Sequence, residues 1–335
     1  MYKYANVGSS IVIDGATDLL PVVSIMIPTY NRPALLNEAI QSALNQITDF
    51  PFEVVVVDNS SDDYSKIVDE IVQSYLPSPI RLFRNSSNIG MYGNWNRCAL
   101  LARANWLCIL NDDDLISNNF VENAFQCTSE NVSIICAEKV VFDERIVRED
   151  TALEVLKKIQ SDKRVAIFNK MLFEYLIFSN LLGNSSGLLI NKQFFLLVGG
   201  ANELNYPSSD YYTWIEMGKL GDLMIMKNVF CLYRIGFNES LKFEVLTGFI
   251  IKDYLMRLSL CKNYRIYEKY IFRTLMMLSA TRALRNIKAV WGVDVSNESA
   301  LALIGYKTWW LYFKVNKIEM LYRIFIRLRL LRKPK

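Results

Sequence analysis

The sequence contains no histidine among its 335 residues. That absence excludes Ser-His-Asp and Cys-His catalytic groups, His-ligated zinc sites and the side chain that most often moves protons near pH 7. If the chain is an enzyme, its acid–base and metal chemistry must therefore rest on carboxylates. Glycine and proline are also scarce, with 14 and 8 residues, which excludes a collagen-like or low-complexity chain.

Long apolar runs are missing as well. No window of about 18 residues is free of charge, so we expect no membrane-spanning helix, and the N-terminus lacks the pattern of a signal peptide. The six cysteines form no Cys-x-x-Cys pair and mostly lie in apolar runs, which predicts buried, reduced thiols in a cytosolic protein. Hydrophobic residues make up 52% of the chain, enough for a large core in one or two domains.

Positive charge is concentrated at the C-terminal end. Residues 306–335 carry nine Lys or Arg against one acid, Glu319, a net charge of +8, whereas the whole chain is only +4. Because Trp, Phe, Ile and Leu are interleaved with these charges, the tail is typical of a helix lying in an anionic membrane interface. The alternatives are a core helix with a solvated basic face and a nucleic-acid patch. We favour the membrane and expect no nucleic-acid partner.

From residue 21 the sequence alternates between short β-rich runs and helical periodicity. Strands are expected over residues 22–27, 53–57, 80–83 and 106–110. Helices are expected between them over residues 33–46 and 90–103. This alternation predicts an α/β fold with a parallel sheet. Further along, residues 168–182 predict an aromatic-rich helix, 183–187 a loop, and 241–335 a wholly helical region.

Polar and acidic residues follow three of the predicted strands. They are Pro28-Thr29-Tyr30-Asn31-Arg32, Asp58-Asn59-Ser60-Ser61-Asp62-Asp63 and Asn111-Asp112-Asp113-Asp114. Ligands of parallel sheets bind beyond the carboxyl ends of the strands, so these segments mark the candidate site. No Gly-x-Gly-x-x-Gly follows the first strand and no Walker A sequence occurs, which weakens a dinucleotide-binding interpretation and excludes a P-loop NTPase.

Three consecutive carboxylates at one strand end repel each other unless a cation lies among them. Mg²⁺ or Mn²⁺ binds one or two carboxylates together with substrate phosphates, and acts as a Lewis acid on the leaving oxygen of a diphosphate. The alternative is a solvated acidic turn in which Asp114 or Ser117 caps the next helix. The position after a buried parallel strand favours the metal site.

These motifs, with Asn88-Ile89-Gly90 and Asn96 between the second and the last, resemble in order and spacing those of the family 2 glycosyltransferases. That family consists of inverting enzymes of the GT-A fold. The similarity covers residues 21 to about 130, and a weaker match continues through Gly199–Glu203, Asp210 and Tyr233-Arg234.

The resemblance implies a GT-A domain, with a Rossmann-like, mostly parallel central sheet flanked by helices, over residues 21–240. Its nucleotide-sugar half would cover 21–130 and its acceptor half 131–240. An N-terminal extension of residues 1–20 precedes it, and a helical C-terminal region of residues 241–335 follows it.

The same resemblance assigns the donor site. The nucleotide-sugar pocket would be formed by Pro28, Thr29, Tyr30, Asn31, Arg32, Asp58, Asn88, Gly90, Asn96, Asn111 and Asp112. Asp58 would hydrogen-bond the base edge, with an Asx-turn as its alternative role. Asn88 and Asn96 could equally be turn and helix-surface residues.

The divalent metal, Mn or Mg, would be held by Asp113 and Asp114. The register of the motif stays open between Asn111-x-Asp113 and Asp112-x-Asp114, and we predict Asp113 as the principal ligand. The family often has a histidine after Tyr-Arg that helps to hold the metal, and this chain has Gly236 there. We therefore predict weak metal affinity in the absence of nucleotide.

An inverting transferase needs a general base that deprotonates the acceptor hydroxyl. The resemblance places this base at Asp210, with Ser209 where the family usually has Glu. The alternative role for Asp210 is a helix N-cap.

The sequence thus predicts a metal-dependent inverting glycosyltransferase with a nucleotide-diphosphate sugar donor. Its acceptor would be a lipid-linked or growing bacterial surface polysaccharide of O-antigen or capsule type. The protein would be cytoplasmic, bound peripherally to the inner face of the cell membrane through residues 306–335. Two alternatives stay open: a nucleotidyltransferase with a related sheet, which would release pyrophosphate, and a catalytically inactive membrane-associated accessory protein.

Overall fold

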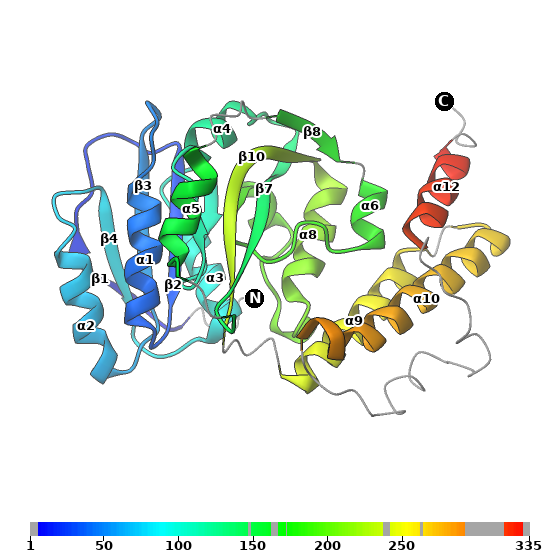
Figure 1. Ribbon diagram of the computed structural model, residues 1–335. Helices are drawn as coiled ribbons and strands as arrows, with labels where there is room; N and C mark the ends of the chain where they lie inside the picture. The colour runs from blue at the N-terminus through cyan, green and yellow to red at the C-terminus, as the bar shows by residue number, and fades with distance from the viewer. Residues whose placement is uncertain are drawn as a thin grey trace. The chain divides into compact units, whose positions relative to one another are not determined.

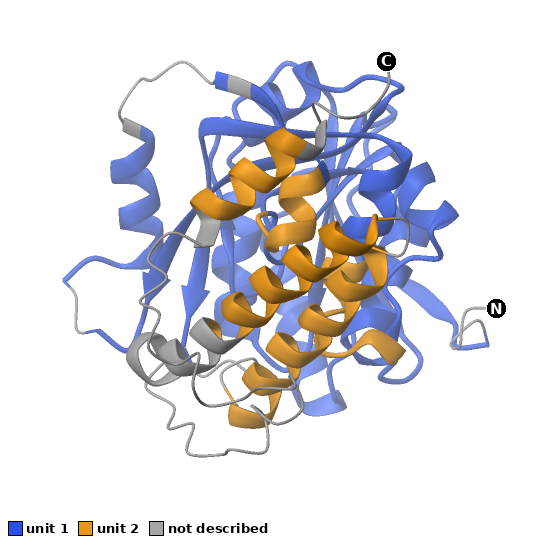
Figure 2. Ribbon diagram, turned by 90° about the vertical axis from the view of Figure 1, so that its right-hand side faces the viewer, with its two compact units in different colours: residues 1–173, 182–203, 213–236 blue, residues 174–181, 204–212, 237–335 orange. Residues whose placement is uncertain are grey.

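The structure is a computed structural model that describes residues 6–146, 149–161, 167–171, 173–236, 242–261, 264–291 and 318–330. The chain divides into two compact units (Figure 2). Unit 1, blue in Figure 2, comprises residues 1–173, 182–203 and 213–236. Unit 2, in orange, comprises residues 174–181, 204–212 and 237–335.

Unit 1 is built around one mixed sheet (Figure 1). Its strands are β1 (Ser9–Asp14), β2 (Val23–Thr29), β3 (Phe52–Asp58), β4 (Ile80–Asn85), β5 (Trp106–Ile109), β6 (Leu115–Ile116), β7 (Val132–Asp143), β8 (Ile167–Met171), β9 (Leu188–Asn191) and β10 (Asp222–Ile235). In the part of the chain that is described, their order is β1-β4-β3-β2-β5-β9-β7-β10-β6, and β8 pairs with β10.

The parallel part of the sheet, β4-β3-β2-β5, positions the site. Val54, Val55, Val56 and Val57 of β3 are fully buried, as expected for a strand that is covered on both faces. The connections carry α1 (Pro33–Leu44), α2 (Asp62–Gln73) and α3 (Gly90–Leu101). Right-handed crossovers place α1 and α2 on one face and α3 on the other (Figure 1), so the chain reverses direction across the sheet between β2 and β5.

The remaining helices of unit 1 follow the same alternation. They are α4 (Phe120–Gln126), α5 (Ala152–Ser161), α7 (Lys192–Leu197) and most of α8 (Ser209–Leu220), with a short 3₁₀ helix η1 (Glu203–Asn205) between the last two. The strands, helices and parallel pairing predicted for residues 22–110 are confirmed, with ends that differ by at most two residues.

Two segments differ from the sequence-based expectation. Residues 9–14, inside the predicted N-terminal extension, form β1, which pairs antiparallel with β4 and puts Ser9 opposite Asn85. The helix predicted over 168–182 is wrong in its first part, because residues 167–171 form β8 and α6 (Phe173–Phe178) begins only afterwards. In both cases a partner strand distant in sequence determines the structure, and local periodicity does not reveal it. The loop predicted over 183–187 is confirmed.

All the regular secondary structure described in unit 2 is helical, as predicted for residues 241–335. Besides α6 it contains α9 (Phe243–Leu260), α10 (Ile266–Trp291) and α12 (Ile318–Leu330). The rings of Tyr264, Phe272, Tyr322 and Phe325 contact one another and join the start of α10 to α12. No helix among the described residues is long and apolar enough to cross a membrane. All six cysteines are free; five are buried, as predicted, and Cys127 is half-buried.

Candidate functional site

The ends of β2 and β5 meet at the point where the sheet reverses direction. The Thr29 hydroxyl donates a hydrogen bond of 2.8 Å to Oδ2 of Asp112, and the Tyr30 N–H donates to the same oxygen at 3.4 Å. Thr29 and Asp112 are buried, Pro28 in β2 is half-buried, and the Tyr30 side chain is exposed. Reversal points of this kind form ligand crevices in open α/β sheets. The structure therefore joins two of the three predicted segments directly.

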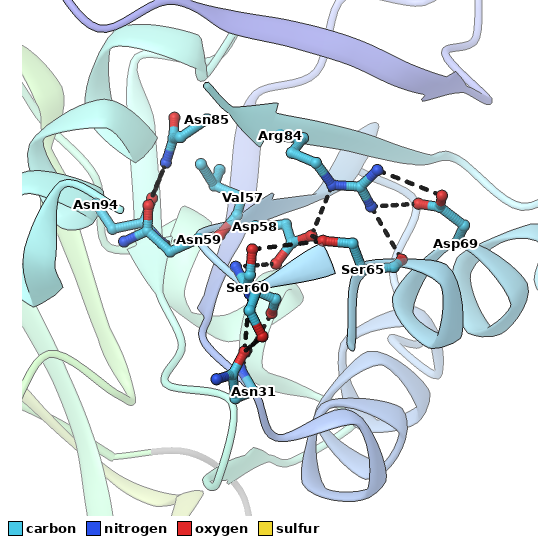
Figure 3. Close-up of polar contacts among 11 residues, drawn as sticks. Asn31, Val57, Asp58, Asn59, Ser60, Ser65, Asp69, Arg84, Asn85 and Asn94 are labelled. Atoms are coloured by element: carbon cyan, nitrogen blue, oxygen red, sulfur yellow. Dashed lines mark hydrogen bonds and ion pairs between the residues drawn. The ribbon is translucent and has the colours of Figure 1, made fainter. Parts of the chain in front are cut away.

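Asn31 connects the remaining predicted segment, residues 58–63, to these two (Figure 3). Its φ of 55° lies in the left-handed region, which asparagine tolerates better than most residues. Its N–H donates to the Ser60 hydroxyl at 3.0 Å, and its side-chain oxygen accepts a 3.0 Å bond from the Ser61 N–H. The turns after β2 and β3 are thus held against each other.

Asp114 is fully buried, and both of its carboxylate oxygens accept hydrogen bonds. Oδ1 accepts from the Arg234 N–H at 2.9 Å. Oδ2 accepts from the side-chain amides of Asn184 at 2.8 Å and Asn111 at 3.2 Å. Because these bonds engage both oxygens from the protein side, Asp114 stabilises the turn. Its predicted role as a metal ligand stays a prediction.

Asp113 has a different environment. Burial, and then the charges of Asp114 and Asp112, raise the pKa of Asp113 to about 7, and the Arg32 charge opposes the rise only in part. Arg32 Nη1 lies 3.1 Å from Oδ2 of Asp113, and the Arg32 side chain is 41% exposed. Burial also raises the pKa values of Asp112 and Asp114. The turn therefore lacks positive charge, and an added cation would relieve that deficit at Asp113.

The carboxylate oxygens of this turn fit a hard divalent ion that a bound nucleotide diphosphate helps to hold. Carboxylate oxygens are the ligands such ions prefer. Within the described residues, no three His, Cys, Asp or Glu side chains are grouped so as to hold a metal by themselves. Asp113 would consequently share the ion with oxygens of a bound diphosphate and with water, and the weak metal affinity expected in the absence of nucleotide stays a prediction.

Arg234, at the end of β10, contacts the acidic turn that residues 111–114 form. Only 4% of this residue is exposed. Its Nε–H donates to the Asp113 carbonyl at 2.8 Å, and its two terminal nitrogens form ion pairs with Glu38 of α1 and Glu144. The sequence indicated Arg234 only through a weak Tyr-Arg match. It contained no signal for either glutamate, because neither belongs to a local pattern.

The loop before β9 supplies three more polar groups that the sequence analysis missed. The Ser186 hydroxyl accepts from the Asn111 N–H at 3.0 Å, and the Ser185 hydroxyl donates to the Asn111 side-chain oxygen at 3.4 Å. Asn184 binds Asp114, as described above. The run of small polar residues Asn-Ser-Ser was visible in the sequence, but its contact with residue 111 depends on the fold.

Asp58, the predicted base contact, is fully buried in a polar cluster (Figure 3). Its Oδ1 accepts from the Ser60 N–H at 2.7 Å, which is the Asx-turn considered as the alternative. Its Oδ2 accepts from Arg84 Nε at 3.0 Å and from the Ser65 hydroxyl at 3.4 Å. Arg84 also pairs with Asp69 of α2. The Asx-turn is thus present, and the base contact stays a prediction.

The Asn88–Gly90 turn and Asn96 belong to α3 and its start. The Asn88 side-chain oxygen accepts from the Gly90 N–H at 2.8 Å, and Gly90 has a φ of 72°. The Asn96 amide donates to the Ala201 carbonyl and accepts from the Ala201 N–H, both at 2.8 Å. A Cβ on Gly200 would lie 2.2 Å from the Asn96 oxygen, so glycine is required there. Asn96 ties α3 to a distant loop.

Asp210, the predicted base, lies in unit 2 in the first turn of α8, whereas the residues above belong to unit 1. Its Oδ1 accepts from the Tyr211 N–H at 2.7 Å. The Tyr211 hydroxyl donates to the Leu176 carbonyl and accepts from Arg257 Nε at 3.2 Å. These bonds fix the start of α8 against α6 and α9. The role of Asp210 stays a prediction.

Comparison with known proteins identifies relatives of this chain. Residues 24–185 match the family model Glycosyl transferase family 2. The chain is 28% identical over 190 residues to an uncharacterized glycosyltransferase of Haemophilus influenzae, a match that covers 57% of this chain and 60% of that protein. It is 26% identical over 262 residues to the GalNAc(5)-diNAcBac-PP-undecaprenol beta-1,3-glucosyltransferase of Campylobacter jejuni, covering 73% and 79%.

Two solved structures have the same fold. S. aureus TarS 1–349 in complex with UDP-GlcNAc matches with a TM-score of 0.58 at 16% identity, over 84% of this chain and 79% of that chain. The mannosyltransferase PcManGT from Pyrobaculum calidifontis, in complex with GDP-Man and Mn²⁺, matches with a TM-score of 0.52 at 15% identity, over 98% and 91%. These likenesses confirm the predicted GT-A fold.

Replacing Arg234 by lysine tests the support of the acidic turn. Lysine keeps the charge but has a single nitrogen, which cannot reach the Asp113 carbonyl and both glutamates together. We expect Arg234→Lys to lower the free energy of unfolding by about 2 to 3 kcal/mol in urea denaturation. The matched control is Arg145→Lys, whose ion pair with Asp143 lies at the surface and should change stability by less than about 1 kcal/mol. Equal losses in the two variants would contradict this role of Arg234.

Proposed function

Because the chain is a glycosyltransferase of family 2 with the GT-A fold, we propose that it transfers a sugar from a nucleotide-diphosphate donor with the help of Mn²⁺ or Mg²⁺. Its acceptor would be a lipid-linked or growing bacterial surface polysaccharide of O-antigen or capsule type. The observation that carries the proposal is the acidic turn at the carboxyl end of β5, where Asp113 faces the exposed Arg32 and has a pKa raised to about 7.

The donor half of the proposal follows from that turn. Asp113 would hold the metal, and a divalent ion supplies Lewis-acid stabilisation of the departing diphosphate when it is bound. Arg32 adds a positive charge beside it, and Thr29 and Tyr30 keep Asp112 in place. The solved structures of the same fold support this donor class, since one is a complex with UDP-GlcNAc and the other a complex with GDP-Man and Mn²⁺.

The acceptor half rests on Asp210. With no histidine in the chain, a carboxylate must remove the proton from the acceptor hydroxyl. Asp210 is half-buried at the start of a helix that α6 and α9 hold in place through Tyr211. The acceptor class is supported by the Campylobacter jejuni relative, whose name describes an undecaprenol-linked glycan.

The membrane part of the proposal concerns α12. Its Tyr322, Phe325 and Ile326 are buried. Its outer face combines apolar and basic side chains that are exposed, namely Met320, Leu321, Ile324, Leu328, Arg323 and Arg327. Such a face suits an anionic lipid surface on the cytoplasmic side of the cell membrane. Trp309, Trp310 and Phe313, which the sequence analysis assigned to the same tail, lie outside the described residues.

A thermal-shift panel of UDP, GDP, dTDP and CMP, each with Mn²⁺, Mg²⁺ or EDTA, tests the donor site. We expect one nucleoside diphosphate to stabilise the protein only when metal is present, by about 2.7 kcal/mol at a hundredfold excess over Kd. Asp113→Asn should abolish this stabilisation, because it removes the proposed metal ligand. The exposed Asp63→Asn on α2 should retain it.

Two outcomes of the panel would contradict the donor proposal. Stabilisation by none of the nucleotides would favour the accessory-protein alternative. Micromolar binding of Mn²⁺ to the nucleotide-free protein in calorimetry would contradict the shared coordination of the metal.

Asp210→Asn tests the base. Since amide cannot accept the proton, kcat should fall by about 10² to 10⁴ while the donor Kd stays unchanged. Release of nucleoside diphosphate from the donor that the panel selects, with water as acceptor, provides the measurement. Glu216→Gln, an exposed substitution on the same helix, is the control. Wild-type turnover by Asp210→Asn would assign the base elsewhere.

Sedimentation with phospholipid vesicles tests the membrane surface. We expect binding to vesicles that contain phosphatidylglycerol and none to neutral ones at physiological salt. Arg323→Glu together with Arg327→Glu should weaken binding about tenfold or more, because each basic residue near an anionic surface contributes about 1 kcal/mol. The same charge reversal at the exposed Lys66 and Lys157 of unit 1 is the control. Equal weakening in both pairs would contradict a specific role of α12.

A further inference from the structure

Three buried asparagines form a continuous chain of hydrogen bonds beside Asp58 (Figure 3). Asn59 follows β3, Asn85 ends β4, and Asn94 lies in α3. Their exposed fractions are 5%, 6% and 2%. Buried amides are costly unless all of their groups find partners, so the arrangement of these partners is informative.

The hydrogen bonds fix the orientation of each amide. The Asn85 side-chain nitrogen donates to the Asn59 oxygen at 2.7 Å and to the Asn94 oxygen at 3.0 Å. The Asn94 nitrogen donates to the Val57 carbonyl at 2.8 Å. Because an amide nitrogen has two N–H donors and its oxygen only accepts, Asn85 uses both donors inside the chain.

At one end of this row of asparagines, Asn59 contacts three segments of the predicted pocket. The Asn59 backbone N–H donates to the Thr29 carbonyl at 3.0 Å. Its side-chain oxygen accepts from the Ile89 N–H at 3.4 Å, and its nitrogen donates to the Gly90 carbonyl at 3.3 Å. Asn59 also directly follows Asp58. One buried residue therefore joins the ends of β2 and β3 to the turn that begins α3.

At the other end of this row of asparagines, Asn85 contacts the N-terminal strand β1. The Ser9 hydroxyl of β1 donates to the Asn85 side-chain oxygen. Arg97 of α3, 8% exposed, donates to the Ser9 hydroxyl at 2.6 Å and to the Val7 carbonyl. The pairing of β1 with β4 puts Ser9 directly opposite Asn85. The segment predicted as a mere extension thus closes the polar chain.

We propose that Ser9, Asn85 and Asn59 are positioning residues of the donor site, and that β1 is part of the apparatus that holds the nucleotide pocket in shape. This inference rests on the proposed function, since it takes Asp58 and Gly90 as pocket residues. The physical reason is the continuity of the hydrogen bonds from Ser9 through Asn85 to Asn59. Loss of the Ser9 hydroxyl removes the donor to Asn85 and an acceptor of Arg97, so the amides rearrange and the Gly90 turn loses its fixed position. A less preorganised pocket binds its nucleotide more weakly.

Ser9→Ala and Ser24→Ala form a matched pair of variants for the test. Ser24 is fully buried, and its hydroxyl donates to Glu53 at 2.6 Å at the other end of β2 from the pocket. Both variants remove one hydroxyl from the same sheet, and both should lower Tm. Ser9→Ala should in addition raise the nucleoside diphosphate Kd in calorimetry and the donor KM about three- to tenfold, with kcat unchanged. Ser24→Ala should leave both unchanged.

Ser9→Thr provides the rescue, because it keeps the hydroxyl, and it should retain the wild-type Kd. Equal Kd values for wild type and Ser9→Ala, or equal increases in both serine-to-alanine variants, would overturn the inference while leaving the proposed function intact. A wild-type protein that binds none of UDP, GDP and dTDP would overturn the proposed function and this inference with it.

Discussion

Mutual repulsion among Asp112, Asp113 and Asp114 is the constraint on which the site depends. Three adjacent carboxylates with little exposure are stable only if each finds compensation. Asp114 finds it in backbone and amide donors, and Asp112 in the Thr29 hydroxyl and the Tyr30 N–H. Asp113 faces the partly exposed Arg32 and has a pKa raised to about 7. Two carboxylates of the turn are therefore engaged in structure, and the third, Asp113, is the one that we propose as the metal ligand.

Because the buried carboxylates need hydrogen-bond donors, segments that are distant in sequence contact this one turn. The end of β2, the loop before β9 and the end of β10 each contribute hydrogen-bond donors to it, and Arg234 donates to the Asp113 carbonyl. Arg234 is itself balanced by two glutamates, so that positive charge is not in excess behind the turn. In the proposed function, a divalent metal that also binds the diphosphate of the donor would supply the positive charge that Asp113 still lacks.

The sequence predicts the parallel half of the fold well, because buried strands and amphipathic helices are local patterns and the residues that follow the strands share one edge of the sheet. It does not distinguish among the three aspartates, since burial and partners come from segments far away in the chain. The strands β1 and β8 were missed for the same reason, as their partners β4 and β10 are remote in sequence. Glu38 and Glu144 carry no motif, so only the fold shows that they balance Arg234.

The most direct test of the central claim is to identify the phosphate product. The protein would be incubated with UDP-, GDP- and dTDP-sugars and Mn²⁺, and the products followed by ³¹P NMR. This account predicts that one donor releases its nucleoside diphosphate, and that Asp113→Asn does not release it. Release of pyrophosphate would identify a nucleotidyltransferase, and a donor that binds but stays intact would identify an inactive accessory protein. Either result would contradict the account.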